Sequence, residues 1–283
     1  MVAQVAIVIE WMIGIKSSLG GYMMKKTTML KVLPIAIGAI LLTGCGKSAA
    51  DKSEKTTIHV SAAASLKDSM TDIKAKFEKK NANIKVDIDY AGSGQIVQRV
   101  KSGAPVDGVL LASEADSSAL TKAKLASDQT KFAGNELVIV ANKKAKVDTL
   151  TASQVKSYLK GTDKIAIGNV DSVPAGEYAK QSLTNLNLYT ALKNQYVGAQ
   201  DVRQVLSYVE SGNAQAGFVY QTDAKISKKV KVIYKVPAKL HDAIGYYSDV
   251  VNDSKVKDET NKFLAYLQTD TAEKILAGYG FKI

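Results

Sequence analysis

Residues 199–220 read AQDVRQVLSYVESGNAQAGFVY and contain a polar turn, an amphipathic stretch and an apolar run. Four apolar side chains recur at i, i+3, i+4 and i+7, which is the spacing of one face of a helix: Val202, Val205, Leu206 and Val209. Asp201 directly precedes this helix and is most simply its N-cap. The apolar run 218–220 then predicts a buried strand, so the stretch predicts a helix packed beside a strand.

The same alternation continues on both sides of this stretch. A helix over 65–80 is predicted from apolar residues at steps of four, three and four: Leu66, Met70, Ile73 and Phe77. Strands are predicted at the runs 58–60, 84–88, 109–111, 137–141, 165–167 and 230–234. Strands that alternate with helices are typical of an α/β chain with largely parallel sheets. Two lobes would have to be joined by strands, because no long low-complexity linker interrupts residues 58–283.

The composition excludes several classes of protein. The 283 residues are 46% hydrophobic, which is well above the disordered class. One cysteine and two histidines exclude a disulfide scaffold and a Cys- or His-rich metal site. The net charge is +11, but it comes from scattered lysines without interleaved aromatic residues. This pattern does not favour nucleic acid, and it agrees with a protein anchored near an anionic envelope.

The N-terminal region predicts export. Residues 24–45 read MKKTTMLKVLPIAIGAILLTGC, in which lysines precede a short apolar run. That run is about half of the ~20 residues that a membrane-spanning helix needs, so it favours a secretory signal. It ends in Leu42-Thr43-Gly44-Cys45, which resembles a bacterial lipobox with Cys45 as the lipidated residue. A buried free cysteine is the alternative.

These features divide the start of the chain. We expect residues 1–44 to be a signal peptide, of which 1–23 form an over-extended start, and 45–57 to be a lipidated tether. The alternative for the apolar run at 2–15 is an extra membrane segment.

Four junctions before predicted helices share one chemistry: 62–66 (AAASL), 90–95 (YAGSGQ), 173–177 (VPAGE) and 200–203 (QDVR). Each helix start offers unpaired N–H groups and the positive end of the helix dipole, which together favour an anion. Ser65 and Asp68 have the spacing of a capping box. Ser65 alone is most simply a cap and Tyr220 alone a core tyrosine, but several converging junctions would bind a dianion without Lys or Arg.

In combination, these segments resemble the molybdate-binding proteins of bacterial molybdate ABC transporters, across nearly all of residues 58–283. Six segments carry the resemblance: AAASL (62–66), GSGQIVQRVKSGAPVD (92–107), GNELVIVAN (134–142), VPAGEYAKQSL (173–183), AQDVRQVLSYVESGNAQAGFVY (199–220) and YGF (279–281). In that family two serine hydroxyls, two sets of backbone amides and a tyrosine hydroxyl hold a tetrahedral oxyanion. The resemblance assigns these roles to Ser65, Ser93, Ala175, Val202 and Tyr220.

The chain departs from the family pattern in two places. The second motif, often serine-rich, is Gly-Ser-Gly at 92–94, so hydroxyls that would flank Ser93 are missing. The strand 108–111 lacks the more usual phenylalanine, which we interpret as repacking. Asp107 is expected to be structural, and Arg203 is expected to lie on a helix face or form an ion pair rather than touch the ligand.

The resemblance implies a two-lobe α/β fold of the periplasmic-binding-protein type II, which bends at a hinge and holds its ligand in the cleft between the lobes. We expect chain crossings near 137–142 and 244–251. Lobe 1 would take residues 58–136 and 250–283, and lobe 2 residues 137–249.

The implied function is an extracytoplasmic lipoprotein, anchored to the membrane, that captures molybdate and tungstate and delivers them to an ABC permease. It would act as a monomer without a cofactor, and molybdenum would enter only as the oxyanion, without direct bonds from the protein. Sulfate, another tetrahedral oxyanion, is the alternative ligand. Only the size of the cavity would separate molybdate from the smaller sulfate, and the sequence does not give that size. A monoprotonated phosphate needs an acceptor, which the five positions do not offer.

Two other classes of function have less support. An envelope hydrolase would need an activated nucleophile, but the chain has no G-x-S-x-G motif, and His59 and His241 have simple structural explanations. A surface adhesin or scaffold lipoprotein would leave the converging junctions unexplained.

Overall fold

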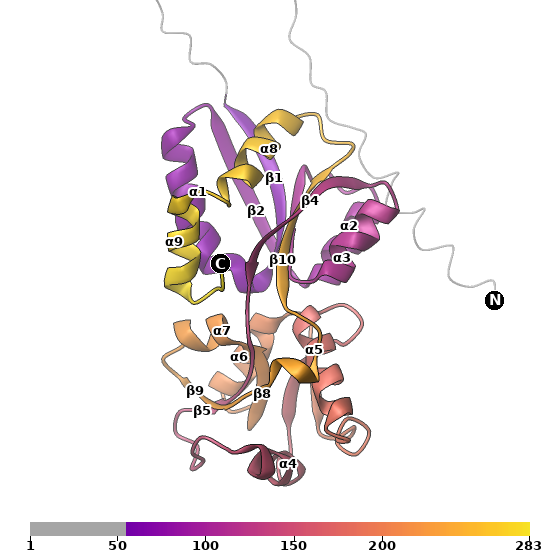
Figure 1. Cartoon of the computed structure of the whole chain (residues 1–283), viewed down its shortest axis with the longest axis vertical. Coiled ribbons are helices and arrows are strands. Elements are labelled where there is room, and N and C mark those ends of the chain that lie inside the picture. Colours follow the sequence, from indigo (N-terminus) through magenta and orange to yellow (C-terminus); the bar gives the residue numbers. More distant parts are fainter. Residues whose placement is uncertain (1–54) are drawn as a thin grey trace, which may run out of the picture. The chain divides into compact units, whose positions relative to one another are not determined.

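The computed structural model describes residues 55–283, which belong to one compact unit. The predicted signal peptide, Cys45 and nearly all of the tether lie outside the described residues. The described part contains two five-stranded sheets, each with its own helices (Figure 1). No helix within residues 55–283 is long and apolar enough to cross a membrane.

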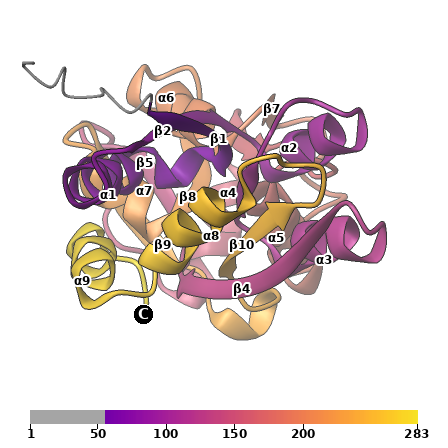
Figure 2. The ribbon, with the colours of Figure 1, turned by 90° about the horizontal axis from the view of Figure 1, so that it is seen from above.

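The first lobe is built on a sheet of strand order β2-β1-β3-β10-β4. Its strands are β1 (Thr56–Ala63), β2 (Ile84–Ala91), β3 (Gly108–Leu111), β4 (Ala126–Gly134) and β10 (Gly245–Val251). Figure 2 shows α1 (Lys67–Lys80), α8 (Lys257–Tyr266) and α9 (Asp270–Tyr279) on one side of the sheet, and α2 (Ser93–Lys101) and α3 (Glu114–Lys122) on the other. Both faces are therefore buried: on β3, Leu110 packs in one apolar cluster while Val109 and Leu111 pack in the other.

The second lobe repeats this plan with strand order β7-β6-β8-β5-β9. Its strands are β5 (Leu137–Asn142), β6 (Ile165–Gly168), β7 (Tyr196–Ala199), β8 (Ala216–Tyr220) and β9 (Val230–Lys235). Its helices are α4 (Ala152–Lys160), α5 (Pro174–Asn185), α6 (Val202–Glu210) and α7 (Gln221–Ile226). The predicted valine face of α6 is buried against β6 and β8. Gly217 allows this contact, because a Cβ there would lie 2.7 Å from Val209 Cγ2.

The α/β class and the two lobes agree with the prediction, but the sheets are mixed rather than largely parallel. In the first sheet β1 runs parallel to β2 and β3, whereas β10 is antiparallel to β3 and β4. In the second sheet β6 is parallel to β7 and β8, whereas β5 is antiparallel to β8 and β9. The reversed strand of each sheet, β5 or β10, is the one that directly follows a crossing between the lobes.

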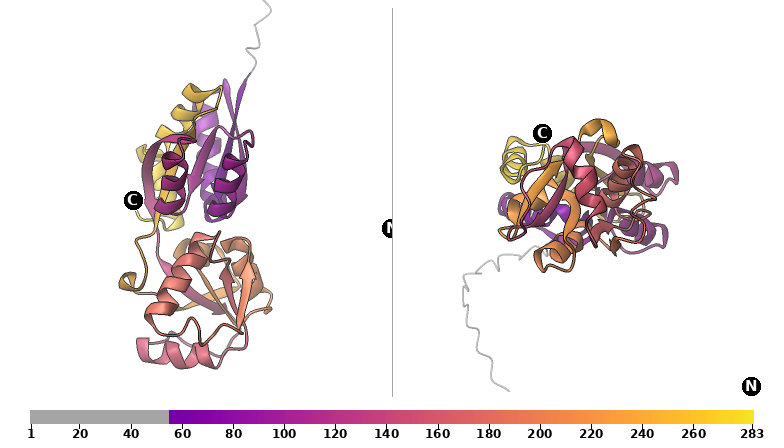
Figure 3. Two further views of the ribbon diagram at one scale, coloured as in Figure 1. Left: turned by 90° about the vertical axis from the view of Figure 1, so that its right-hand side faces the viewer. Right: turned by 90° about the horizontal axis from the view of Figure 1, so that it is seen from below.

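The chain crosses between the lobes slightly earlier than expected. Residues 135–136 connect β4 to β5, and residues 236–244 connect β9 to β10 (Figure 3). β5 lies wholly in the second sheet and β10 wholly in the first, so neither is itself a crossing. The expected lobe boundary between residues 249 and 250 falls inside β10 and moves to the segment before Gly245. β10 pairs with β3 on one side and β4 on the other, and six of its seven residues are buried, so it is an inner strand of the first sheet.

Candidate functional site

The five predicted positions line one cavity at the meeting of the two lobes. Ser65 belongs to a 3-10 turn (Ala64–Leu66) after β1, and Ser93 is the first residue of α2, both in the first lobe. Ala175 is the second residue of α5, Val202 the first of α6 and Tyr220 the last of β8, all in the second lobe. The structure thus brings the predicted residues together, and their roles as ligands stay a prediction.

The cavity is small and carries no cationic side chain. The space open to the centre of a water-sized sphere is about 10 Å³, whereas pockets for larger organic solutes measure roughly 300–1,000 Å³. The remaining lining residues are mostly small: Ala63, Ala64, Ala91, Gly92, Ala112, Val173, Pro174 and Asp201. No Lys, Arg or His is among the lining residues, so any anion here must be held by dipoles and neutral donors.

Two helix starts aim free amides at the cavity. Pro174 is the first residue of α5 and has no N–H, so Ala175 provides an early amide, and no acceptor for it occurs among residues 55–283. At α6 the Asp201 carboxylate accepts from the N–H groups of Arg203 and Gln204, at 2.8 and 2.9 Å. This confirms Asp201 as the N-cap. The Val202 N–H is left without an acceptor in the described part of the chain.

Three hydroxyl groups complete the lining. Ser93 Oγ accepts a hydrogen bond of 3.0 Å from the Ala112 N–H. Ser65 Oγ lies 2.9 Å from the phenolic oxygen of Tyr246. Tyr220 is 1% exposed, and its hydroxyl has no partner among the described residues. A buried polar group without a partner costs about 1–3 kcal/mol, which an acceptor on a bound ligand would offset.

Burial keeps the phenol of Tyr220 protonated. Desolvation is the main cause that raises its pKa well above the ordinary value of 10.0, and the neighbouring Tyr246 adds to the rise. Tyr220 is therefore a hydrogen-bond donor throughout the neutral range.

The predicted capping box of Ser65 and Asp68 is wrong. A 3-10 turn precedes α1, and the N-cap of α1 is Leu66, which has no side-chain cap. The Ser65 hydroxyl is instead directed to Tyr246, and the Asp68 carboxylate to Arg203. Ser65 therefore contacts a strand of its own lobe, and of these two residues only Asp68 reaches the other lobe.

Arg203 lies outside the cavity and forms ion pairs, as predicted. Its Nε is 2.8 Å from Asp223 Oδ1, and its terminal nitrogen is 2.5 Å from Asp68 Oδ2. The same nitrogen donates a bond of 3.3 Å to the Ser65 carbonyl. Asp223 is completely buried, and desolvation raises its pKa to about 6 against the opposing effect of Arg203. The guanidinium thus supports the turn that carries Ser65 without reaching the cavity.

The other singled-out polar residues have structural roles. Asp107 accepts from the His59 N–H at 2.8 Å and from the Ser254 hydroxyl at 2.7 Å, which confirms the structural prediction. His59 is exposed on β1, and His241 Nδ1 lies 2.7 Å from the Asp242 carbonyl. Neither histidine lines the small cavity.

The Gly-Ser-Gly departure has a packing explanation. The Gly94 N–H donates to the Ser172 carbonyl of the other lobe at 3.0 Å. A Cβ at Gly94 would lie 2.7 Å from Ser172 Cα, and one at Gly92 would lie 2.9 Å from the Gln200 carbonyl oxygen. The two glycines let the backbones of the lobes meet on either side of Ser93.

Two functional candidates were missed in the sequence, Tyr246 and Asn135. Tyr246 is completely buried on β10, and Asn135 lies in the first crossing, where its amide donates to the Tyr246 hydroxyl at 3.1 Å. Asn135 falls inside the GNELVIVAN segment that resembles the family, but no motif marked its side chain. Tyr246 had no signal, because its partner Ser65 is 181 residues away.

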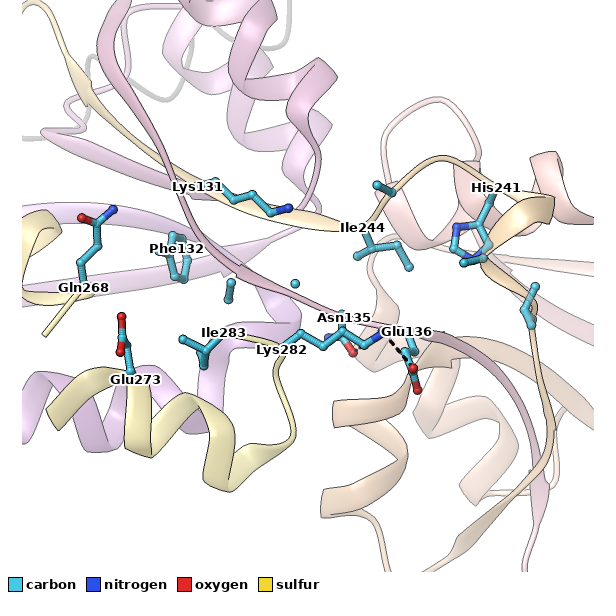
Figure 4. A pocket seen from close by; sticks show the side chains of 15 residues that line it. Lys131, Phe132, Asn135, Glu136, His241, Ile244, Gln268, Glu273, Lys282 and Ile283 are labelled. Carbon is cyan, nitrogen blue, oxygen red and sulfur yellow. Dashed lines mark hydrogen bonds and ion pairs between the residues drawn. The ribbon is translucent and has the colours of Figure 1, made fainter. Parts of the chain in front are cut away.

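A larger cavity of about 620 Å³ lies at the hinge and is a separate feature (Figure 4). It is lined by parts of β4, the second crossing and the C-terminus, and Figure 4 shows the ion pair of 2.8 Å between Lys282 and Glu136 at its edge. None of the five predicted positions lines it.

Comparison with known proteins identifies the family of the chain and relatives that share its fold. Residues 58–282 match the family described as bacterial extracellular solute-binding protein. The "Putative ABC transporter substrate-binding lipoprotein YvgL" of Bacillus subtilis is 38% identical over 265 residues, covering 89% of this chain and 99% of YvgL. The molybdate-binding protein ModA of Haemophilus influenzae is 34% identical over 261 residues, which cover 91% of this chain and 99% of ModA. Among solved structures, the periplasmic molybdate-binding protein of Azotobacter vinelandii superposes with a TM-score of 0.72 at 23% sequence identity. The superposition covers 80% of this chain and 99% of the Azotobacter chain, which shows that the two share a fold.

Proposed function

Because the chain belongs to the bacterial extracellular solute-binding proteins, we propose that it captures molybdate, and also tungstate, and delivers it to an ABC permease in the membrane. The family binds solutes and does not catalyse reactions. The observation that carries the choice of ligand is the cavity of Ser65, Ser93, Ala175, Val202 and Tyr220, which offers donors from both lobes and no cationic side chain.

Neutral donors suit a small dianion. Hydrogen bonds to a charged group contribute roughly 1.5–3 kcal/mol each, so five of them offset a large part of the desolvation of the anion. The starts of α2, α5 and α6 add a favourable dipole, at about 0.3–1 kcal/mol each when exposed and more when partly buried. Asp201 is the one carboxylate in the lining, and its Oδ1 is engaged in capping α6.

The proposed location follows from the N-terminal residues together with the family. Residues 1–44 would act as a signal peptide, Cys45 would carry a lipid, and 45–57 would tether the folded part to the outer face of the cell membrane. The name of YvgL, which includes the word lipoprotein, supports this arrangement. Function as a monomer without a cofactor is part of the same proposal.

Calorimetric titration tests the ligand. The protein purified from the cell envelope in detergent is titrated separately with molybdate, tungstate, sulfate and phosphate. We expect tight binding of molybdate and tungstate and weaker binding of the other two. Tighter binding of sulfate than of molybdate would replace the proposed ligand with the alternative, and a lack of heat with all four anions would overturn the proposal. Mass spectrometry of the native N-terminus tests the lipid on Cys45.

A further inference from the structure

A chain of hydrogen bonds leads from the hinge to the cavity, and its direction can be worked out from the groups that cannot reverse. The Glu136 N–H donates to Asn135 Oδ1 at 2.9 Å. A backbone N–H can only donate, so it fixes the amide of Asn135 with its oxygen toward Glu136. The Asn135 NH₂ group therefore faces Tyr246 Oη at 3.1 Å and Thr222 Oγ1 at 2.9 Å.

This orientation decides where the proton of Tyr246 goes. Its oxygen accepts from Asn135, so its single proton is directed to the remaining neighbour, Ser65 Oγ, at 2.9 Å. Ser65 Oγ then accepts, and its own proton is left for the cavity that Ser65 lines. All of these groups are buried: Ser65 is 3% exposed, Asn135 7% and Tyr246 0%.

The hydroxyls of Ser93 and Tyr220 also have protons that are free to point into the cavity. Ser93 Oγ accepts from the Ala112 N–H at 3.0 Å, which leaves its proton free. The Tyr220 hydroxyl has no partner among the described residues. The cavity therefore presents protons from all three hydroxyls as well as from the amides.

We propose that Asn135 and Tyr246 are positioning residues that fix Ser65 as a donor, and that they thereby select a fully deprotonated oxyanion over one that carries a proton. This inference rests on the proposed function of the cavity. An anion with an O–H group needs an acceptor in the site. The direction of this hydrogen-bond chain, the relay, removes the acceptor that Ser65 would otherwise offer. Asp201, whose Oδ1 caps α6, is then the remaining side-chain acceptor in the lining, so the relay decides whether Ser65 adds a second one. Selection would thus depend on a residue at the hinge that does not touch the ligand.

Replacing Asn135 with aspartate reverses the relay. A carboxylate can only accept, so Tyr246 would donate to it, Ser65 would donate to Tyr246, and a Ser65 lone pair would face the cavity. The N135D variant is titrated with molybdate, sulfate and phosphate at about pH 8, where phosphate is mostly the singly protonated dianion. All three ligands then carry the same charge, so the added negative charge weakens them alike and cancels from the ratios of their dissociation constants.

We expect the ratio of the phosphate constant to the molybdate constant to fall by about tenfold or more in N135D. The ratio of sulfate to molybdate should stay within about twofold of the wild-type ratio, because neither anion carries a proton. A parallel loss of affinity for all three anions would overturn the inference while the proposed function stood. A wild-type protein that binds none of them would overturn the proposed function itself.

A second variant keeps the test informative if N135D folds poorly. Y246F removes the proton that fixes Ser65, so the serine can rotate and act as donor or acceptor. We expect molybdate and sulfate affinities to fall by about threefold to tenfold, and phosphate affinity to fall less. Y266F is the matched control, because Tyr266 also has a buried hydroxyl but lies on α8, away from the cavity. Equal losses for all three anions in Y246F would contradict the directional role.

Discussion

Arg203 on α6 and Asp68 on α1 form an ion pair of 2.5 Å that joins the two lobes. Arg203 follows Val202, whose amide faces the cavity, and Asp68 lies three residues after Ser65, which also lines it. The pair therefore closes next to the proposed ligand and is made only when the lobes meet. Arg203 is also held from its own lobe by the buried carboxylate of Asp223, at 2.8 Å, so its position is set before closure.

Replacing Asp68 with asparagine should weaken ligand binding modestly. The Asp68 side chain is 42% exposed, so solvent screens the pair and we expect a loss of about 0.3–1 kcal/mol. The dissociation constant for molybdate should rise by less than about fivefold, and the difference from wild type should shrink as salt is added. The matched control is Asp89→Asn, which breaks the pair of Asp89 and Arg99 within the first lobe. Equal effects of the two substitutions would argue against a tie between the lobes.

Replacing Tyr220 with phenylalanine should separate binding from stability. The buried hydroxyl has no partner among the described residues, so its removal should leave the free protein equally stable or slightly more stable. Binding should weaken by about 1–3 kcal/mol, because a hydrogen bond to a charged ligand is lost. Calorimetry gives the affinity and thermal melting gives the stability. Tyr266→Phe makes the same chemical change away from the cavity, and an unaltered affinity is expected there. If Tyr220→Phe binds molybdate as tightly as wild type, Tyr220 is not a ligand.

The sequence predicted those parts of the site that depend on local pattern. The apolar spacing from Val202 to Val209 placed the start of α6 correctly, and the resemblance brought five distant positions to one cavity. The relay could not be predicted, because Asn135 and Tyr246 are 111 residues apart and meet only after β4 and β10 pair. The antiparallel direction of β10 was missed for a similar reason, because β10 joins the first sheet only after the chain has built the whole second lobe.

Replacing Gly94 with alanine should hinder closure without unfolding the protein. Alanine is a better helix former than glycine, so the start of α2 should tolerate it in the separated lobes. In the closed arrangement its Cβ would lie 2.7 Å from Ser172 Cα, which is backbone and cannot rotate away. We expect the dissociation constant for molybdate to rise by about tenfold or more, with the melting temperature of the free protein preserved. Gly278→Ala is the control, because nothing lies within 4 Å of a Cβ there. Wild-type affinity in Gly94→Ala would show that the lobes need not approach so closely.

Ligand affinity should be nearly independent of pH from about pH 7 to 9. Amides and serine hydroxyls do not titrate there. Burial raises the pKa of Tyr220 and of Tyr246 above the ordinary value of 10.0, so both phenols keep their protons. Titrations at constant ionic strength measure this directly. A change of about tenfold per pH unit in that range would require a titrating group in the site and would contradict the neutral-donor arrangement.

Stability, in contrast, should depend on pH through Asp249. Its side chain is completely buried on β10, and the Ser117 hydroxyl lies 2.9 and 2.8 Å from its two oxygens. Desolvation raises its pKa to about 6, against the smaller opposing effect of the Ser117 hydrogen bond. The folded chain therefore holds this proton more tightly than the unfolded chain, whose carboxyl has a pKa of about 3.9. As pH rises from about 4 to 6 the folded state loses relative stability, and above pH 6 the full penalty of the buried charge applies.

Replacing Asp249 with asparagine should remove that penalty. The amide oxygen can accept from the Ser117 hydroxyl and the amide nitrogen can donate back to the Ser117 oxygen, so both polar atoms of the new side chain keep a partner. At pH 7 we expect the free energy of unfolding to rise by about 1–3 kcal/mol, whereas at about pH 3.5 the variant and the wild type should be equal. Asp87→Asn is the control, and it should lower the free energy of unfolding at pH 7 rather than raise it, because a hydrogen bond from Lys85 lowers the pKa of Asp87. Urea unfolding at several pH values measures how the free energy of unfolding of each variant changes with pH. A lower free energy of unfolding for Asp249→Asn than for wild type at pH 7 would show that the Asp249 carboxylate stabilises the fold.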